Sequence, residues 1–224
     1  QDVNNFDGID CPISCSCLGT FVDCSKRKLN HVPNPLPIWC ETLDLSENSI
    51  DEILPGSFRG LVNLKKLYLT KNQLKFVSSN LFSDIQVPNQ ITILKCHTPQ
   101  LQEIKFDNNL LNEFPHLIGL ENLTTINLNH NNIDSLANAS TDWYPNLQTI
   151  ELNSNFVSNI PSGFFSNSSK ITNLYLTNNR IVTFDKGAFD NLTCLEVLKL
   201  TKNRIIALPK ELLRNLRNLK ELDL

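Results

Sequence analysis

One eleven-residue pattern recurs along the chain and limits its fold more than any other feature does. In each complete copy, apolar residues occupy positions 1, 4, 6 and 11, and Asn occupies position 9, as in LQTIELNSNFV at 147–157. The copies begin at Cys40, Leu64, Leu101, Leu123, Leu147, Ile171, Leu195 and Leu219. They are 24, 37, 22, 24, 24, 24 and 24 residues apart. Because one unit this short cannot bury its apolar side alone, the pattern predicts that the copies stack as the coils of a solenoid.

The positions of the pattern have separate physical roles. The alternating apolar residues predict a short strand with one buried and one solvent-facing side. The Asn falls where the chain must leave the strand in a sharp bend, and its amide can both donate and accept hydrogen bonds there. We therefore predict a structural Asn ladder that joins coil to coil, formed by Asn48, Asn72, Asn109, Asn131, Asn155, Asn179 and Asn203.

A second set of apolar residues lies six positions before the next copy and predicts a partial inner spine. Phe58, Phe165 and Phe189 occupy this position, and Leu213 occupies it in the last coil. Phe82 lies at the equivalent distance, 18 residues, after its own copy begins at Leu64. The coil that begins at Leu123 has Thr141 there instead. We expect Trp143 or Tyr144 to fill the space.

Four of the seven Cys residues lie within fourteen positions near the start of the chain, at Cys11, Cys15, Cys17 and Cys24. Zinc binding is the alternative interpretation, but the four His residues are scattered and none has ligand spacing. A disulfide-stapled cap in an oxidising compartment is therefore favoured. Residues 11–39 would cover the apolar face of the first coil.

The cap and repeats together resemble extracellular leucine-rich-repeat proteins over residues 11–224. The narrower resemblance is to the leucine-rich repeats and immunoglobulin-like domains family. It rests on VDCSKRKLNHVPNPLPIW in the cap, on the shortened repeat at 101–119, and on NLYLTNNRIVTFDKGAFDNL at 173–192 with the repeats that follow it. The predicted fold is an α/β solenoid, a leucine-rich-repeat horseshoe with a parallel concave sheet and an N-terminal cap, truncated at the C-terminus. The resemblance also implies the disulfides Cys11–Cys17 and Cys15–Cys24.

The resemblance implies a cell-surface protein with immunoglobulin-like domains after the repeats and a single membrane span. Such a protein would modulate growth-factor receptor signalling, with a protein ectodomain, for example that of a growth-factor receptor, as its partner. The alternative is a secreted matrix protein that binds collagen-like or glycan ligands, because matrix proteoglycans share the cap spacing. Both readings place the chain outside the cell.

The predicted organisation is a tail and cap at 1–39, followed by about eight coils at 40–224 with the last incomplete. No apolar run reaches the ~20 residues of a membrane span, so a membrane would be reached only through segments absent from this chain. The net charge of −3 is small, and we expect no nucleic-acid partner.

Two features do not fit the repeat. About 13 surplus residues lie between Leu64 and Leu101, and we place them near 86–100 as a loop. Cys40, Cys96 and Cys194 remain outside the cap, so at least one thiol is free or pairs elsewhere. We expect Cys40 to be buried as a small hydrophobe.

The solvent-facing strand positions predict a concave binding face. Its candidate contact residues are Tyr68, Lys105, Glu151, Tyr175 and Lys199. The mixture of aromatic and charged side chains is typical of protein recognition, although a solvated face without a partner would have the same pattern. A basic run from Lys199 to Lys220 is interspersed with acidic residues and is better explained as a solvated surface than as a heparin site.

No catalytic motif and no cofactor motif occurs in the sequence, so we expect a binding protein rather than an enzyme. Four N-x-S/T sequons predict glycosylation, at Asn122, Asn138, Asn167 and Asn191. We expect two or three of them to be used.

Overall fold

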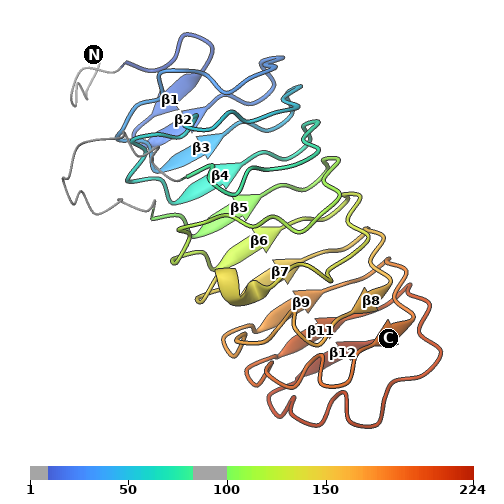
Figure 1. Cartoon of the computed structure of the whole chain (residues 1–224). Coiled ribbons are helices and arrows are strands. Elements are labelled where there is room, and N and C mark those ends of the chain that lie inside the picture. Colours follow the sequence, from blue (N-terminus) through green and yellow to red (C-terminus); the bar gives the residue numbers. More distant parts are fainter. Residues whose placement is uncertain (1–9, 83–99) are drawn as a thin grey trace, which may run out of the picture.

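The computed structural model describes residues 10–82 and 100–224. They form a solenoid whose strands stack into one ten-stranded sheet along one side (Figure 1). The order is β1-β2-β3-β4-β5-β6-β7-β9-β11-β12, so successive coils are also neighbours in space. The predicted leucine-rich-repeat solenoid with a parallel sheet is confirmed.

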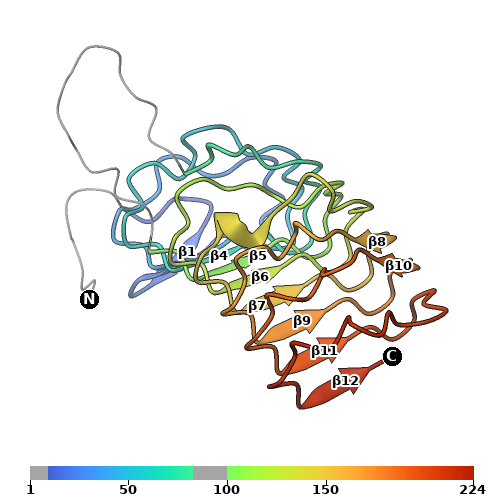
Figure 2. The ribbon, with the colours of Figure 1, turned by 60° about the horizontal axis from the view of Figure 1, so that its bottom comes forward.

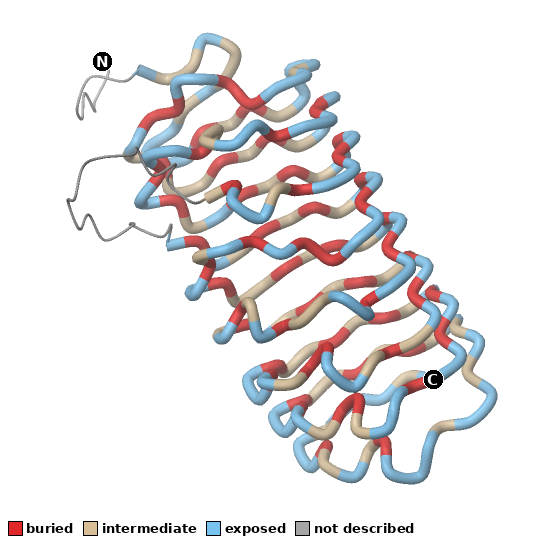
Figure 3. Tube along the Cα trace, viewed as in Figure 1, coloured by how far each residue is buried: buried red, intermediate tan, exposed pale blue. Residues whose placement is uncertain are grey.

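The sheet strands are three residues long and occur once per coil. Their bounds are β1 Ser16–Leu18, β2 Phe21–Asp23, β3 Thr42–Asp44, β4 Lys66–Tyr68, β5 Glu103–Lys105, β6 Thr125–Asn127, β7 Thr149–Glu151, β9 Asn173–Tyr175, β11 Val197–Lys199 and β12 Glu221–Asp223. In the three-residue strands from β3 to β11 the middle residue is fully buried, and the outer residues are partly exposed except Lys66, which is exposed. Figure 3 shows buried positions that recur from coil to coil. The period-two pattern of the sequence thus sets which side of each strand meets the core.

The convex side is built almost wholly of turns. Within the described residues it holds a two-stranded parallel sheet of β8 (Asn159–Ile160) and β10 (Thr183–Phe184), and one 3-10 helix, η1 (Thr141–Trp143). Turns such as those at 55–60 and 186–191 take the place of α-helices. The predicted class is an α/β solenoid, but the only helix in the part of the chain that the structure describes is the 3-10 helix η1. The convex connections between strands are too short to sustain α-helices.

The cap is tied to the first coil through both covalent and hydrogen bonds. Cys11 is bonded to Cys17 and Cys15 to Cys24, the pairing that the family resemblance implies. Strands β1 and β2 form an antiparallel hairpin, and β2 continues the sheet by parallel pairing with β3. The sheet is thus continuous across residue 39, where the sequence predicts the boundary between cap and repeats. That domain boundary stays a prediction.

The Asn ladder has the same geometry in each interior coil. Asn155 is 3 % exposed. Its Nδ2 donates to the carbonyls of Leu152 in its own coil (3.1 Å) and Leu128 in the preceding coil (2.9 Å). Its Oδ1 accepts from the backbone N of Ile133 at 3.1 Å. One amide side chain therefore serves three buried backbone groups in two coils.

The residue before each ladder Asn has a positive φ of 54–58°, a conformation rare for residues other than Gly. These residues are Glu47, Lys71, Asn108, His130, Ser154, Asn178 and Lys202. They produce the sharp bend behind the strand. The ladder holds this unfavourable backbone conformation in every coil.

Aromatic rings fill the core behind η1. Tyr144 is the residue that occupies the space, with 2 % exposure. Its hydroxyl donates to the Pro115 carbonyl at 2.6 Å and accepts from the Leu117 N–H at 2.9 Å. Burial raises the pKa of Tyr144, so the hydroxyl keeps its proton. Thr141 is also buried, and its hydroxyl donates to the Phe164 carbonyl at 2.8 Å.

Residues 86–99 of the surplus segment lie outside the described residues, as does Cys96. Strand β4 nevertheless pairs directly with β5, with Leu67 opposite Ile104, so the register of the sheet passes from one side of the surplus to the other without a break. No helix among the described residues is long and apolar enough to cross a bilayer.

We expect Asn155→Ala to lower the free energy of unfolding by roughly 1–3 kcal/mol, because buried backbone groups of two coils lose their partner. Since neighbouring coils stabilise each other, the loss should appear in the melting of the whole solenoid. Thermal and urea unfolding measure it. Asn132→Ala is the matched control, because Asn132 is exposed in the adjacent coil and its replacement should change stability by less than about 0.5 kcal/mol. Equal stability of the two variants would contradict the structural role of the ladder.

Candidate binding face on the concave sheet

One row of side chains runs along the middle of the concave sheet at the last position of each strand. The pairing register places these residues side by side, which defines the central row: Asp44, Tyr68, Lys105, Asn127, Glu151, Tyr175, Lys199 and Asp223. All are partly exposed. The five candidate contact residues therefore lie on one surface, at the positions that the repeat predicts.

Tyr68 lies at the centre of a cluster that joins β4 to β5. Its hydroxyl donates to Glu103 Oε2 at 3.4 Å, and the Lys105 Nζ lies 4.7 Å from the centre of its ring. Lys66 and Lys105 each form an ion pair with Glu103, at 3.4 and 3.3 Å. We call these four residues the Tyr68 cluster. It presents a ring face, two ammonium groups and one carboxylate on a rigid sheet.

The surroundings of Tyr68 favour the protonated form of its hydroxyl. Partial burial, followed by the negative charge of Glu103, raises the pKa of Tyr68 above its usual value, and Lys105 opposes that shift. The hydroxyl is therefore a donor at physiological pH. Sequence reasoning identified Tyr68 and Lys105 but missed Glu103, which lies 35 residues beyond Tyr68 and belongs to the adjacent row. The register across β4 and β5 was the signal that could have found it.

Tyr175 has a different environment from Tyr68. Its hydroxyl accepts from Asn173 Nδ2 at 3.3 Å within its own strand, β9. Glu151, which precedes it in the central row, accepts a hydrogen bond from Asn129 Nδ2 at 2.6 Å. The Tyr175 hydroxyl is therefore bonded to a neutral amide, whereas the Tyr68 hydroxyl is bonded to a carboxylate, and the two tyrosines offer a partner different chemistry.

Lys199 is neutralised by the last coil. Its Nζ donates to Asp223 at 2.6 Å and also to Glu221. These hydrogen bonds, first that to Asp223, raise the pKa of Lys199. Elsewhere in the basic run, Lys220 pairs with Glu196 at 2.8 Å and Arg214 with Glu211 at 3.1 Å. Acidic partners thus accompany the basic side chains, as the interspersed sequence indicates.

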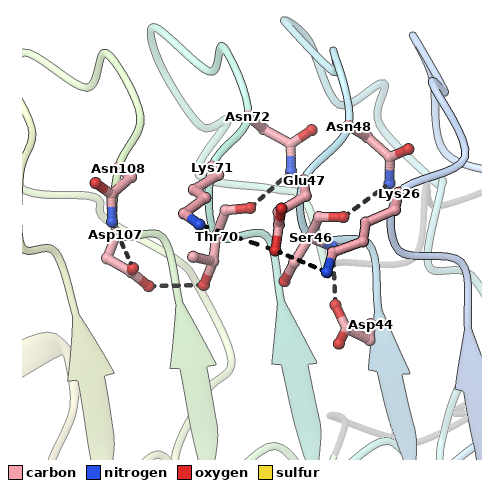
Figure 4. Close-up of polar contacts among 10 residues, drawn as sticks. All are labelled: Lys26, Asp44, Ser46, Glu47, Asn48, Thr70, Lys71, Asn72, Asp107 and Asn108. Carbon is pink, nitrogen blue, oxygen red and sulfur yellow. Dashed lines mark hydrogen bonds and ion pairs between the residues drawn. The ribbon is translucent and has the colours of Figure 1, made fainter.

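A polar rim follows the carboxyl ends of β3 to β5 (Figure 4). Glu47 lies between Lys26 and Lys71, at 3.6 and 3.9 Å. In the next coils, Thr70 donates to Asp107 Oδ1 at 2.7 Å, and Asn108 donates to Asp107 Oδ2 at 2.9 Å. The rim links the ladder bends to the binding face and carries charge of both signs.

The four sequon asparagines are all exposed and lie outside the strands of the sheet. Asn138 and Asn167 lie on the convex side, and the Asn167 Nδ2 donates to Asp142 Oδ2 at 3.0 Å. Asn122 and Asn191 lie in the turns that lead into β6 and β11. Their use as glycosylation sites remains a prediction.

The two cysteines outside the cap that the structure describes differ in exposure. Cys40 is fully buried, and burial raises the pKa of its thiol to about 12, whereas Cys194 is exposed. Over residues 10–82 and 100–224, no group of three or more His, Cys, Asp or Glu side chains is arranged to hold a metal ion.

A family model described as "Leucine rich repeat" matches residues 41–87 and 145–205. The matched segments lie in the coils whose strands, ladder and bends are described above. Over these residues the chain carries leucine-rich repeats. Its narrower resemblance is to the leucine-rich repeats and immunoglobulin-like domains proteins.

Two relatives and one solved structure illustrate this similarity. Human leucine-rich repeats and immunoglobulin-like domains protein 3 is 35% identical over 129 residues, which cover 58% of this chain and 10% of that protein. Lumican of Gallus gallus is 34% identical over 119 residues, 48% of this chain and 34% of lumican. A chain in the octameric complex of Latrophilin 3, Unc5D and FLRT2 superposes with a TM-score of 0.77 at 24% identity, covering 95% of this chain and 62% of that one. The chain thus spans a tenth of the first relative and a third of lumican.

We expect Glu103→Gln to lower the pKa of Tyr68, because the substitution removes a negative charge that opposes the tyrosinate. Lys105→Gln should raise that pKa, because it removes a positive charge that favours the tyrosinate. NMR titration of labelled tyrosine measures both shifts. A Glu103→Gln variant with an unchanged or raised Tyr68 pKa would show that the Tyr68 cluster does not exist in solution.

Proposed function

We propose that this chain is an extracellular protein-binding scaffold that holds the ectodomain of another protein on its concave face, without catalysis. The observation that carries the proposal is the Tyr68 cluster. It places a rigid aromatic ring, two cations and an anion on adjacent strands, and such anchors dominate protein interfaces. The cap disulfides support an oxidising compartment.

The dimensions of the face fit a protein partner. Eight repeat strands at about 4.8 Å spacing give an arc of roughly 35 Å. Tyr68 and Tyr175 are four strand steps apart, about 19 Å. Two anchors at this separation lie within one interface of standard size. The positions of the sequons also favour this face, because each lies outside the strands.

The finer proposal is that the partner is a growth-factor receptor and that the chain is part of a cell-surface modulator of receptor signalling. The similarity to human leucine-rich repeats and immunoglobulin-like domains protein 3 supports it. The second candidate is a secreted matrix protein that binds collagen-like or glycan ligands, which the similarity to lumican favours. Binding of the purified chain to growth-factor receptor ectodomains, fibrillar collagen and heparin, measured side by side, distinguishes the two.

We expect the double variant Tyr68→Ala/Tyr175→Ala to lose at least about tenfold in affinity for a protein partner, because both rings are interface anchors. Both side chains project from the sheet into solvent, so the circular dichroism spectrum should not change. Affinity is measured by surface plasmon resonance against a partner captured by pull-down.

Leu54→Ala is the matched control for that experiment, because Leu54 is 59 % exposed and lies away from the strands of the sheet. Its affinity should equal that of the unmodified chain. Undiminished binding by the folded double variant would move the contact site to the convex side or to an edge.

A further inference from the structure

A groove of about 620 Å³ lies on the convex side, across three successive coils. Its lining comes from residues 76–79, 112–116 and 134–143. It lies over the coil that begins at Leu101, which has 22 residues where the coils after it have 24. Figure 2 shows η1, at one end of this lining, on the opposite side of the coils from the strands. The groove is therefore separate from the concave binding face.

Aromatic side chains form part of the groove wall. The rings of His116 and Trp143 stack with centroids 3.9 Å apart and planes 19° from parallel. Phe76, also in the lining, is 52 % exposed. The lining also includes the polar side chains of Asn112, Glu113 and Asp134. The wall thus combines flat apolar faces with hydrogen-bond acceptors.

One of the four sequon asparagines lines this groove. Asn138 is exposed and belongs to the groove lining, and it is the only one of the four sequon residues that does. Its sequon ends at Ser140, whose Oγ accepts from the Asp142 N at 3.1 Å and so caps η1. That cap fixes the backbone between the sequon and Trp143.

We propose that the convex groove holds the inner N-acetylglucosamine residues of a glycan attached to Asn138. The proposal rests on the extracellular location in the proposed function, because only secretory proteins receive this modification. The glycan would then be part of the folded structure, seated against Trp143, His116 and Phe76.

The chemistry of the groove matches that of the sugar. One face of a pyranose ring presents C–H groups that pack on an aromatic plane, while its edge carries hydroxyl and acetamide groups that hydrogen-bond. Glu113 and Asp134 offer acceptors for those hydroxyl groups. The volume lies within the range of about 300–1,000 Å³ that holds small ligands. Glu113 and Asp134 are exposed, so an apolar partner that covered them would remove their hydrogen bonds with water without replacing them.

Because the glycan is attached to Asn138, weak contacts with the groove are sufficient to hold it there. A covalently tethered group has an effective concentration in the millimolar range or above, so sugar–aromatic contacts that are too weak for free ligands become populated. Asn122 and Asn191 are also exposed, but neither lines the groove. They provide internal controls on the same molecule.

The test uses the chain secreted from mammalian cells and treated, still folded, with peptide N-glycosidase, which cuts the bond between Asn and the first sugar. Glycopeptide mass spectrometry follows each site in time. We expect cleavage at Asn138 to be at least about tenfold slower than at whichever of Asn122 and Asn191 is modified, because the enzyme needs the sugar to leave the groove. After denaturation the rates should become equal.

Two variants test whether the groove is the cause of slow cleavage at Asn138. Phe76→Ser and Trp143→Ala should each bring the Asn138 rate toward that of the controls. Phe76 is half exposed, so its replacement leaves the fold intact even if Trp143→Ala loosens η1.

Three results would overturn the groove proposal alone: Asn138 unmodified while other sequons are modified, equal native rates at all modified sites, or a slow Asn138 rate that neither variant changes. If the chain enters the secretory pathway and no sequon is modified, the groove proposal fails and the protein-binding function stands. A chain that is supplied with a signal peptide and still is not secreted folded contradicts the extracellular location itself.

Discussion

The need to satisfy buried backbone groups behind each strand governs the rest of this structure. Every coil turns sharply after three strand residues, and the turn directs N–H and C=O groups into the interior, where water cannot reach them. The ladder Asn meets this need by donating to two carbonyls and accepting from the preceding coil, as Asn72 does with Leu45, Leu69 and Ile50. Because each amide serves two coils, the bend of one coil depends on its neighbour. The same dependence reaches the cap, where Asn48 accepts from the backbone of Arg27 and Leu29.

The features that follow the period of the repeat could be predicted from the sequence, and those that depend on contacts between coils could not. Strand positions, the buried middle residues and the ladder hold the same places in every copy, whether the copies are 22, 24 or 37 residues apart, so one copy explains the others. The positive φ of Lys71 or Glu47 has no sequence signal, because neither residue type favours it. The contact of Tyr68 with Glu103 requires the register between two coils that are 37 residues apart in sequence. The convex groove depends on how a 22-residue coil packs beside longer ones.

The two sides of the solenoid have different mechanical properties. The concave sheet is hydrogen-bonded strand to strand, so the side chains of the Tyr68 cluster are held before any partner arrives. Such preorganisation lowers the entropic cost of binding. The convex side has few ladder hydrogen bonds, and its order comes from buried rings such as Tyr144 and from polar contacts such as Thr141 with Ser168.

The direct pairing of β4 with β5 has a consequence for how a protein of this kind can change in evolution. The strands meet in the same register whether paired residues are 24 or 37 positions apart in sequence. Lengthening a closed connection by that amount costs only about 0.4 kcal/mol in chain entropy. A gene encoding such a chain can therefore gain residues between coils at little thermodynamic disadvantage, provided that the flanking strands keep their alternation. New loops can arise and diversify beside an established binding surface while that surface keeps its shape.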